Sequence, residues 1–198
     1  MKLYDYLPSG NGYKVRLLLS YLDIKYDFVP VNILKGESQT EAFKSKNPAG
    51  QVPLLELGDG RTLSQSDAIL YFLSEGTPYL PALTFDRATA LQWMFFEQYT
   101  HEPSIAVARY IRHYAMATRE AELPVLMTKG YRALDVMEKH LTGNRWFAGG
   151  GRSVADIALY GYTHVAHEGG FDLADYPAVS DWLARFADHP KHILITDT

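Results

Sequence analysis

A short loop near the start of the chain carries closely spaced hydrogen-bond donors. Residues 8–15 read PSGNGYKV, and the hydroxyl of Ser9 stands two positions before the amide of Asn11. Apolar residues at helical spacing follow in 13–22, so the loop leads into a helix whose first N–H groups lack intrahelical partners. Donors at a helix N-terminus stabilise negative charge. The loop is therefore a candidate site for an anion.

The sequence contains no cysteine. This excludes disulfides, thiolate metal sites and a protein thiol nucleophile, so any sulfur chemistry must come from a ligand. His101 and Glu102 are a weak metal candidate, because adjacent helix positions point about 100° apart. We expect no metal.

Composition excludes further classes of function. The 198 residues are 47% hydrophobic and 21% charged, with a net charge of −4 and no dense cluster of Lys and Arg, so we expect no nucleic-acid partner. The start of the chain lacks the apolar run of a secretion signal. No window reaches the roughly 18 apolar residues of a membrane helix. We expect a cytoplasmic protein without membrane contact.

Two unlike halves position these residues. Strands are predicted at 2–7, 26–31, 52–57 and 61–63, and helices at 13–22 and 66–73, with a hairpin turn at 58–60. From residue 85 onward the periodicity predicts only helices, at 86–115, 118–141, 153–167 and 178–187. Pro103 lies inside the first of these and predicts a kink. The predicted domains are 1–76 and 85–198, joined by a proline-marked linker at 77–84.

Three motifs and this organisation resemble the soluble glutathione transferases over most of the chain. The motifs are NPAGQVPLL at 47–55, LSQSDAI at 63–69 and SVAD at 153–156. The resemblance implies a thioredoxin-like α/β domain that binds glutathione, followed by an all-α helical bundle that shapes the second-substrate pocket, in a homodimer. SVAD has the spacing of a helix capping box, so we interpret Ser153 and Asp156 as structural.

The first two motifs imply a frame for glutathione. A cis Val52–Pro53 bond would turn the Val52 backbone outward, where its N–H and C=O can pair with the cysteinyl part of the ligand. Gln65 and Ser66 would hold the γ-glutamyl end at a helix N-terminus, although Ser66 taken by itself is better interpreted as an N-cap.

The glycyl carboxylate is the remaining end of the ligand. Gln51 stands inside the first motif and is the better candidate partner for that carboxylate. Lys35 is the second candidate, and for it a solvated loop charge is an alternative interpretation.

The resemblance also implies which residues activate the glutathione thiol. The loop at 8–15 is most similar to the bacterial nu class, with Asn11, Gly12 and Lys14 matching and Ser9 replacing a threonine. We therefore assign thiolate stabilisation to Ser9 and Asn11. Tyr6 is the alternative, since other classes use a tyrosine near the end of the first strand. The nu-class pattern implies weak conjugation with stronger reduction of peroxides or disulfides by glutathione.

The helical half supplies the remaining candidates. The second-substrate pocket is expected to include aromatic and polar residues, namely Tyr13, Tyr99, His101, Arg109 and Tyr110. Two alternatives compete with a transferase: a non-catalytic binding or scaffold protein with the same fold, and a glutathione-dependent isomerase or dehalogenase.

Overall fold

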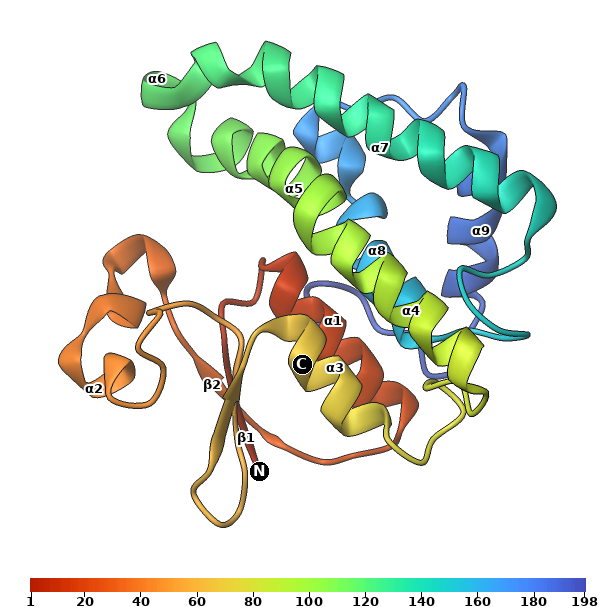
Figure 1. Cartoon of the computed structure of the whole chain (residues 1–198). Helices are drawn as coiled ribbons and strands as arrows, with labels where there is room; N and C mark the ends of the chain where they lie inside the picture. Colours follow the sequence, from red (N-terminus) through yellow and green to blue (C-terminus); the bar gives the residue numbers. More distant parts are fainter. The chain divides into compact units, whose positions relative to one another are not determined.

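The computed structural model describes residues 1–198 and divides into two compact units (Figure 1). The first unit comprises Met1–Glu75 and Pro190–Thr198, and the second comprises Gly76–His189. No helix in either unit combines the length and the apolar character needed to cross a membrane.

The first unit is a four-stranded sheet with helices. Its elements are β1 (Lys2–Asp5), α1 (Gly10–Tyr21), β2 (Asp27–Pro30), α2 (Glu41–Lys44), β3 (Leu54–Glu56), β4 (Thr62–Ser64) and α3 (Ser66–Ser74). The strand order is β2-β1-β3-β4, with β1 parallel to β2 and the other neighbours antiparallel. The predicted β-α-β and β-β-α units are confirmed, and the topology is thioredoxin-like.

Side chains alternate between the two faces of this sheet. Leu3 of β1 packs on one face with Val15 and Leu19 of α1 and with Ile69 of α3. Figure 1 shows α1 and α3 side by side. Leu54 of β3 belongs to a separate cluster with Val31 and Phe43 of α2. The first cluster packs α1 and α3, whose N-terminal ends carry the candidate donors, against the sheet.

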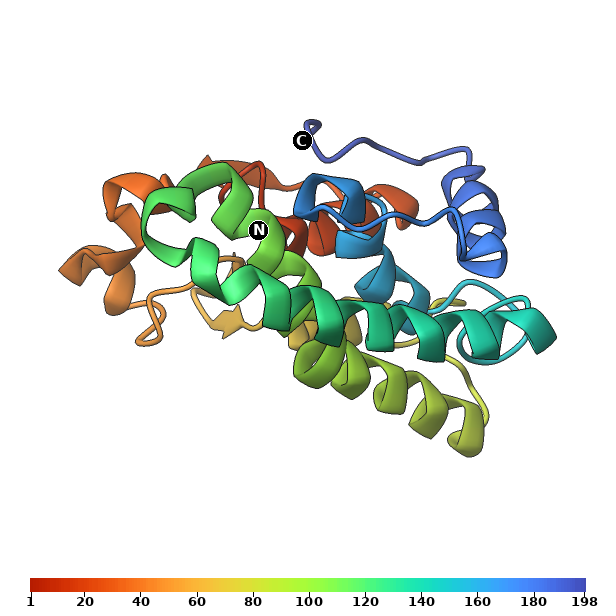
Figure 2. The same ribbon diagram turned by 90° about the horizontal axis from the view of Figure 1, so that it is seen from above.

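The second unit contains only helices. They are α4 (Thr84–Phe96), α5 (Glu102–Tyr110), α6 (Met116–Arg119), α7 (Leu123–Gly143), α8 (Val154–Thr163) and α9 (Pro177–Ala187). Figure 2 shows α7 running alongside α5, with which it packs. Every residue of α8 is buried, as expected for a central helix that is apolar on nearly all sides.

The predicted disturbance at Pro103 takes the form of a π-helical segment. Glu97–His101 is π-helical, and the N–H of Glu102 bonds to the carbonyl of Glu97, five residues back. Proline has no N–H to donate, so the wider turn just before Pro103 accommodates the missing bond.

The last residues pack in the first unit, although the sequence analysis assigned all of 85–198 to the helical domain. Three side chains of α1 bond to backbone carbonyls of this tail. Ser20 bonds to Lys191 (2.8 Å), Tyr13 to Ile193 (2.7 Å) and Arg16 to Ile195 (3.0 Å). Carbonyl acceptors carry no sequence signature, so periodicity gave no indication that the tail packs beside α1.

Candidate active site

The loop before α1 is a tight turn that presents Ser9 at the helix N-terminus. Ser9 is the N-cap, its N–H donates to the carbonyl of Tyr6 (2.7 Å), and its hydroxyl accepts from the N–H of Gly12 (3.4 Å). A Cβ at Gly12 would lie only 1.8 Å from a carboxylate oxygen of Asp5, so only glycine fits there. The first turn of α1 thus packs directly on the end of β1, and Ser9 stands where the helix dipole favours an anion.

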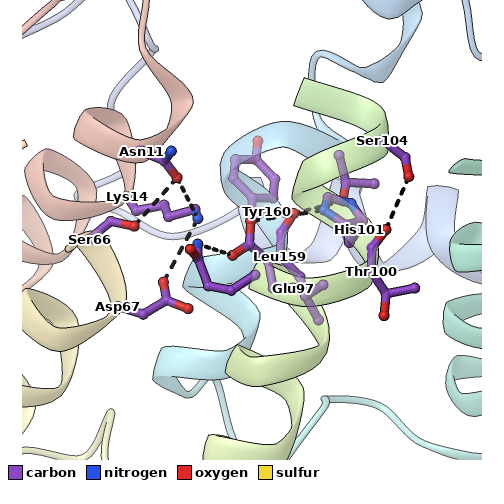
Figure 3. A network of polar contacts seen from close by, with 12 residues as sticks. Asn11, Lys14, Ser66, Asp67, Glu97, Thr100, His101, Ser104, Leu159 and Tyr160 are labelled. Atoms are coloured by element: carbon purple, nitrogen blue, oxygen red, sulfur yellow. Dashed lines mark hydrogen bonds and ion pairs between the residues drawn. The ribbon is translucent and has the colours of Figure 1, made fainter. Parts of the chain in front are cut away.

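Asn11 is held in one orientation. The ammonium of Lys14 donates to the Asn11 Oδ1 at 2.8 Å, and the hydroxyl of Ser66 lies 3.4 Å from the same atom. A lysine ammonium only donates hydrogen bonds, so the atom facing it must be the amide oxygen. Figure 3 shows the Asn11 nitrogen on the side opposite Lys14 and Ser66. The donor half of the amide is therefore directed away from this contact.

Lys14 connects the starts of α1 and α3. Its side chain is fully buried, and its ammonium lies 3.8 Å from a carboxylate oxygen of Asp67 in the first turn of α3. We call Asn11, Lys14, Ser66 and Asp67 the Asn11 cluster (Figure 3). The cluster joins the predicted sulfur loop to the predicted glutamyl site through one buried cation.

The peptide bond between Val52 and Pro53 is cis, as the motif predicts. The paired strand β3 begins only at Leu54, so Val52 lies just beyond its end. The turn before it is fixed by the buried Asn47, whose amide donates to the carbonyl of Gln51 (2.7 Å). The Gln51 side chain is exposed.

Gln65 has an unusual backbone. Its φ is +69°, a value that costs a non-glycine residue about 1–3 kcal/mol, and its side chain is exposed at the start of α3. Ser66 is buried and its hydroxyl is directed at Asn11. Ser66 therefore contacts Asn11, which was not expected from the sequence.

Lys35 is exposed and lies at the end of a short 3-10 helix, Ile33–Lys35.

The candidates for the second-substrate pocket have different environments within their own units. Tyr99 is 90% exposed and Tyr110 is 39% exposed. Arg109 forms an ion pair with Glu168 (2.6 Å). His101 is fully buried and bonds to Thr163 of α8 (2.9 Å).

Tyr13 is fully buried as well, and its hydroxyl bonds the C-terminal tail. Tyr13 and His101 therefore lie in packed interiors, whereas the sequence analysis placed both in a pocket wall. Tyr6, the alternative thiol activator, is half-buried and its carbonyl is engaged by Ser9.

A second buried cation on α1 was missed from the sequence. Arg16 is fully buried, its Nε lies 3.0 Å from the Asp5 carboxylate, and its guanidinium donates to the carbonyls of Leu7 (2.6 Å), Ile195 and Asp197. Burial raises the pKa of Asp5 to about 7, and the neighbouring Arg16 opposes that rise. The available signal was the pair of cations at 14 and 16 inside the apolar stretch YKVRLLL.

The capping box at the start of α8 is confirmed. The Asp156 carboxylate accepts from the N–H groups of Ser153 (2.9 Å) and Phe147 (3.1 Å) and from the indole of Trp182 (3.1 Å). Burial raises the pKa of Asp156 to about 6, against the effect of these bonds. All of its partners lie in the helical core, as expected for a structural role. No group of three or more His, Cys, Asp or Glu side chains is arranged to hold a metal ion.

Comparisons with known proteins agree with this geometry. The family model for the glutathione S-transferase N-terminal domain matches residues 1–75, and that for the C-terminal domain matches residues 89–190. A crystal structure of a glutathione S-transferase from Pseudomonas fluorescens Pf-5 is 50% identical, covers 99% of this chain and 98% of its own, and superimposes with a TM-score of 0.96.

Two further relatives are more distant. The disulfide-bond oxidoreductase YfcG of Escherichia coli (strain K12) is 29% identical over 192 residues, which cover 93% of this chain and 89% of the relative. Yeast Ure2p in complex with S-hexylglutathione is 25% identical, covers 96% of this chain and 95% of its own, and has a TM-score of 0.88. Both family models match in chain order and together span most of the sequence. The chain therefore belongs to the glutathione S-transferase family, and it is a glutathione transferase.

Proposed function

We propose that glutathione binds along the first unit with its sulfur at the start of α1, where Ser9 and Asn11 stabilise the thiolate. The observation that carries this assignment is the fixed orientation of Asn11. Its oxygen is occupied by Lys14 and Ser66, so it meets a ligand through its N–H groups. A thiolate accepts hydrogen bonds, and a correctly presented donor is what it requires.

The rest of the tripeptide has a matching frame in this proposal. The Val52 backbone, beyond the end of β3, pairs with the cysteinyl residue like an added strand. The N–H groups at the start of α3 and the strained Gln65 receive the γ-glutamyl end. Gln51 and Lys35, both exposed, border the glycyl end. The structure of Ure2p in complex with S-hexylglutathione supports glutathione as the kind of ligand.

Thiolate stabilisation needs a modest free energy. A free thiol has a pKa near 8.5, and lowering it by about two units requires roughly 2.7 kcal/mol of preferential stabilisation of the anion. A hydrogen bond to a charged group contributes about 1.5–3 kcal/mol, so the Asn11 amide and the Ser9 hydroxyl together can supply most of it.

We favour disulfide exchange as the first reaction to test, because the relative YfcG is named a disulfide-bond oxidoreductase. The glutathione thiolate attacks one sulfur of a substrate disulfide, which forms a mixed disulfide and releases the other sulfur as a thiolate. This protein has no cysteine to resolve that mixed disulfide. A second glutathione thiolate must therefore attack it, which yields oxidised glutathione and the second substrate thiol.

The same thiolate attacks electrophilic carbon or peroxide oxygen, so conjugation and peroxide reduction remain within the proposal. The electrophile is expected to meet exposed aromatic side chains such as those of Tyr99 and Tyr110. We further propose a cytoplasmic homodimer, in the manner of the family.

The test combines binding with turnover. Calorimetry measures glutathione affinity, and activity is measured with hydroxyethyl disulfide, cumene hydroperoxide and a chloronitrobenzene. We expect the native protein to bind glutathione and to turn over the disulfide fastest. Ser9→Ala/Asn11→Ala is expected to keep most of the affinity and to lose about a hundredfold in turnover, because each of the two lost donors removes about 1.4 kcal/mol.

Asn11→Asp is the matched variant. It keeps an oxygen for Lys14 and Ser66 but replaces the N–H donors by an acceptor, so turnover should fall by at least about tenfold although Ser9 is still present. No glutathione binding by the native protein at millimolar concentration would refute the proposed function and favour a scaffold role. Full turnover in Asn11→Asp would refute the role of the Asn11 amide.

A further inference from the structure

Lys14 is a fully buried cation whose ammonium contacts the side chain assigned to the sulfur. A buried lysine is costly unless it is paired, since desolvation disfavours the charged form. Here the ammonium is bonded to the Asn11 Oδ1 at 2.8 Å and lies 3.8 Å from Asp67. The shorter of these two contacts is made to a neutral amide. The ammonium thus bonds to a neutral amide, a contact that charge pairing does not require.

The contact decides which half of the Asn11 amide faces the ligand. An isolated asparagine amide can rotate by about 180° at little cost, because its oxygen and nitrogen have nearly the same shape. With the oxygen outward, it would repel a thiolate. Lys14 offers only donors, so the flipped amide would place N–H groups against an ammonium inside the protein. The buried charge makes that flip unfavourable.

We infer that Lys14 is a positioning residue that lowers the pKa of the bound glutathione thiol through Asn11, by locking the amide with its N–H groups toward the sulfur. This inference rests on the proposed function, because it takes Asn11 to contact the thiolate. Ser66, at 3.4 Å from the same oxygen, supports the lock more weakly. Asp67, in the first turn of α3, is the carboxylate partner of the ammonium at 3.8 Å.

The alternative within the same site is a direct effect, in which the positive charge of Lys14 attracts the thiolate through space. The two explanations differ in what they require. Positioning needs a hydrogen-bond donor at residue 14 and an amide at residue 11. A field effect needs only the charge, whatever residue stands at position 11.

The experiment titrates the ultraviolet absorbance of the thiolate of glutathione bound at saturation. Lys14→Met removes donor and charge, whereas Lys14→Gln keeps an N–H donor without charge. We expect Lys14→Met to raise the thiol pKa by about one unit, and Lys14→Gln to raise it by less than half as much. Glutathione affinity should change less than about threefold in either variant, because the frame around Val52 and Gln65 is untouched.

A double-mutant cycle with Asn11→Ala gives the decisive comparison. We expect Lys14→Met to produce no further shift in that background, because the amide it orients is gone. An equal shift in both backgrounds, or equal effects of Met and Gln, would overturn positioning in favour of a field effect. If Lys14→Met leaves the thiol pKa unchanged in the protein that retains Asn11, or if neither Lys14 variant folds, positioning is also overturned. A native protein that leaves the thiol at its free pKa would instead refute the proposed function itself.

Discussion

Lys14 and Arg16 are two residues apart on the same helix, and both are fully buried cations, yet their surroundings differ. Arg16 lies 3.0 Å from the buried Asp5 and donates to three backbone carbonyls. Lys14 makes its short contact to the half-buried amide of Asn11, and its carboxylate partner Asp67 is 3.8 Å away. Arg16 is therefore bonded mainly to backbone, whereas Lys14 is bonded to the half-buried side chain of Asn11.

The difference separates a structural cation from a functional one. Arg16 bonds to β1, to the loop at Leu7 and to the C-terminal tail, so these hydrogen bonds stabilise the fold. Lys14 bonds to the side chain of Asn11 and, in our proposal, this bond decides which atoms of Asn11 meet the ligand. Buried charge by itself therefore does not identify an active site. The useful question is whether the partner of the charge can still bind something else.

The largest effect is expected from Arg16→Met. The substitution leaves the Asp5 carboxylate and three carbonyls without their partner, and breaking a buried ion pair in this way costs about 3–5 kcal/mol of the free energy of unfolding. Urea denaturation monitored by circular dichroism measures the loss. Lys14→Met, compared in the same experiment, should lose less, because the Lys14–Asp67 pair is longer (3.8 Å) than the Arg16–Asp5 pair (3.0 Å).

The pH dependence of this loss sharpens the contrast. The pKa of Asp5 is about 7 in the folded protein against 3.8 ordinarily, so the folded state loses stability as pH rises from about 4 to 7 and no further above that. Without Arg16 the pKa of Asp5 rises above 7. The gap between native and Arg16→Met should therefore widen above pH 7. Equal stability of Arg16→Met and Lys14→Met would contradict the distinction drawn between the two cations.

A smaller effect is expected from Asp67→Asn. The amide keeps the shape of Asp67 but removes the charge that faces Lys14, so the ammonium is held less firmly. The thiol pKa of bound glutathione should rise by about half a unit or less, below the effect of Lys14→Met. The same thiolate titration measures it. A larger rise than in Lys14→Met would mean that Asp67 acts on glutathione by another route.

The fold of the first unit could be predicted from the sequence because its signals are local. Period-two and helical patterns gave the order of its elements, and the motif at 47–55 gave the cis bond at Pro53. The capping box at Ser153 was correctly interpreted as structural, because the three-residue spacing between Ser153 and Asp156 is what allows their reciprocal hydrogen bonds at the start of a helix.

The features that could not be predicted from the sequence depend on contacts between residues far apart in the chain. The docking of the tail beside α1 uses backbone carbonyls, which every sequence has. The contact between Asn11 and Ser66 joins positions 55 residues apart. Tyr13 and His101 have types that suit a pocket wall, but their burial is decided by the packing around them.

The most direct test of the account is the thiol pKa of glutathione bound to the native protein and to Ser9→Ala/Asn11→Ala, measured by thiolate absorbance. We predict a value about two units below the free pKa of roughly 8.5 in the native protein, and a return to near 8.5 in the double variant. The same lowered pKa in both proteins would show that the thiolate is stabilised elsewhere, and would contradict the assignment of Ser9 and Asn11.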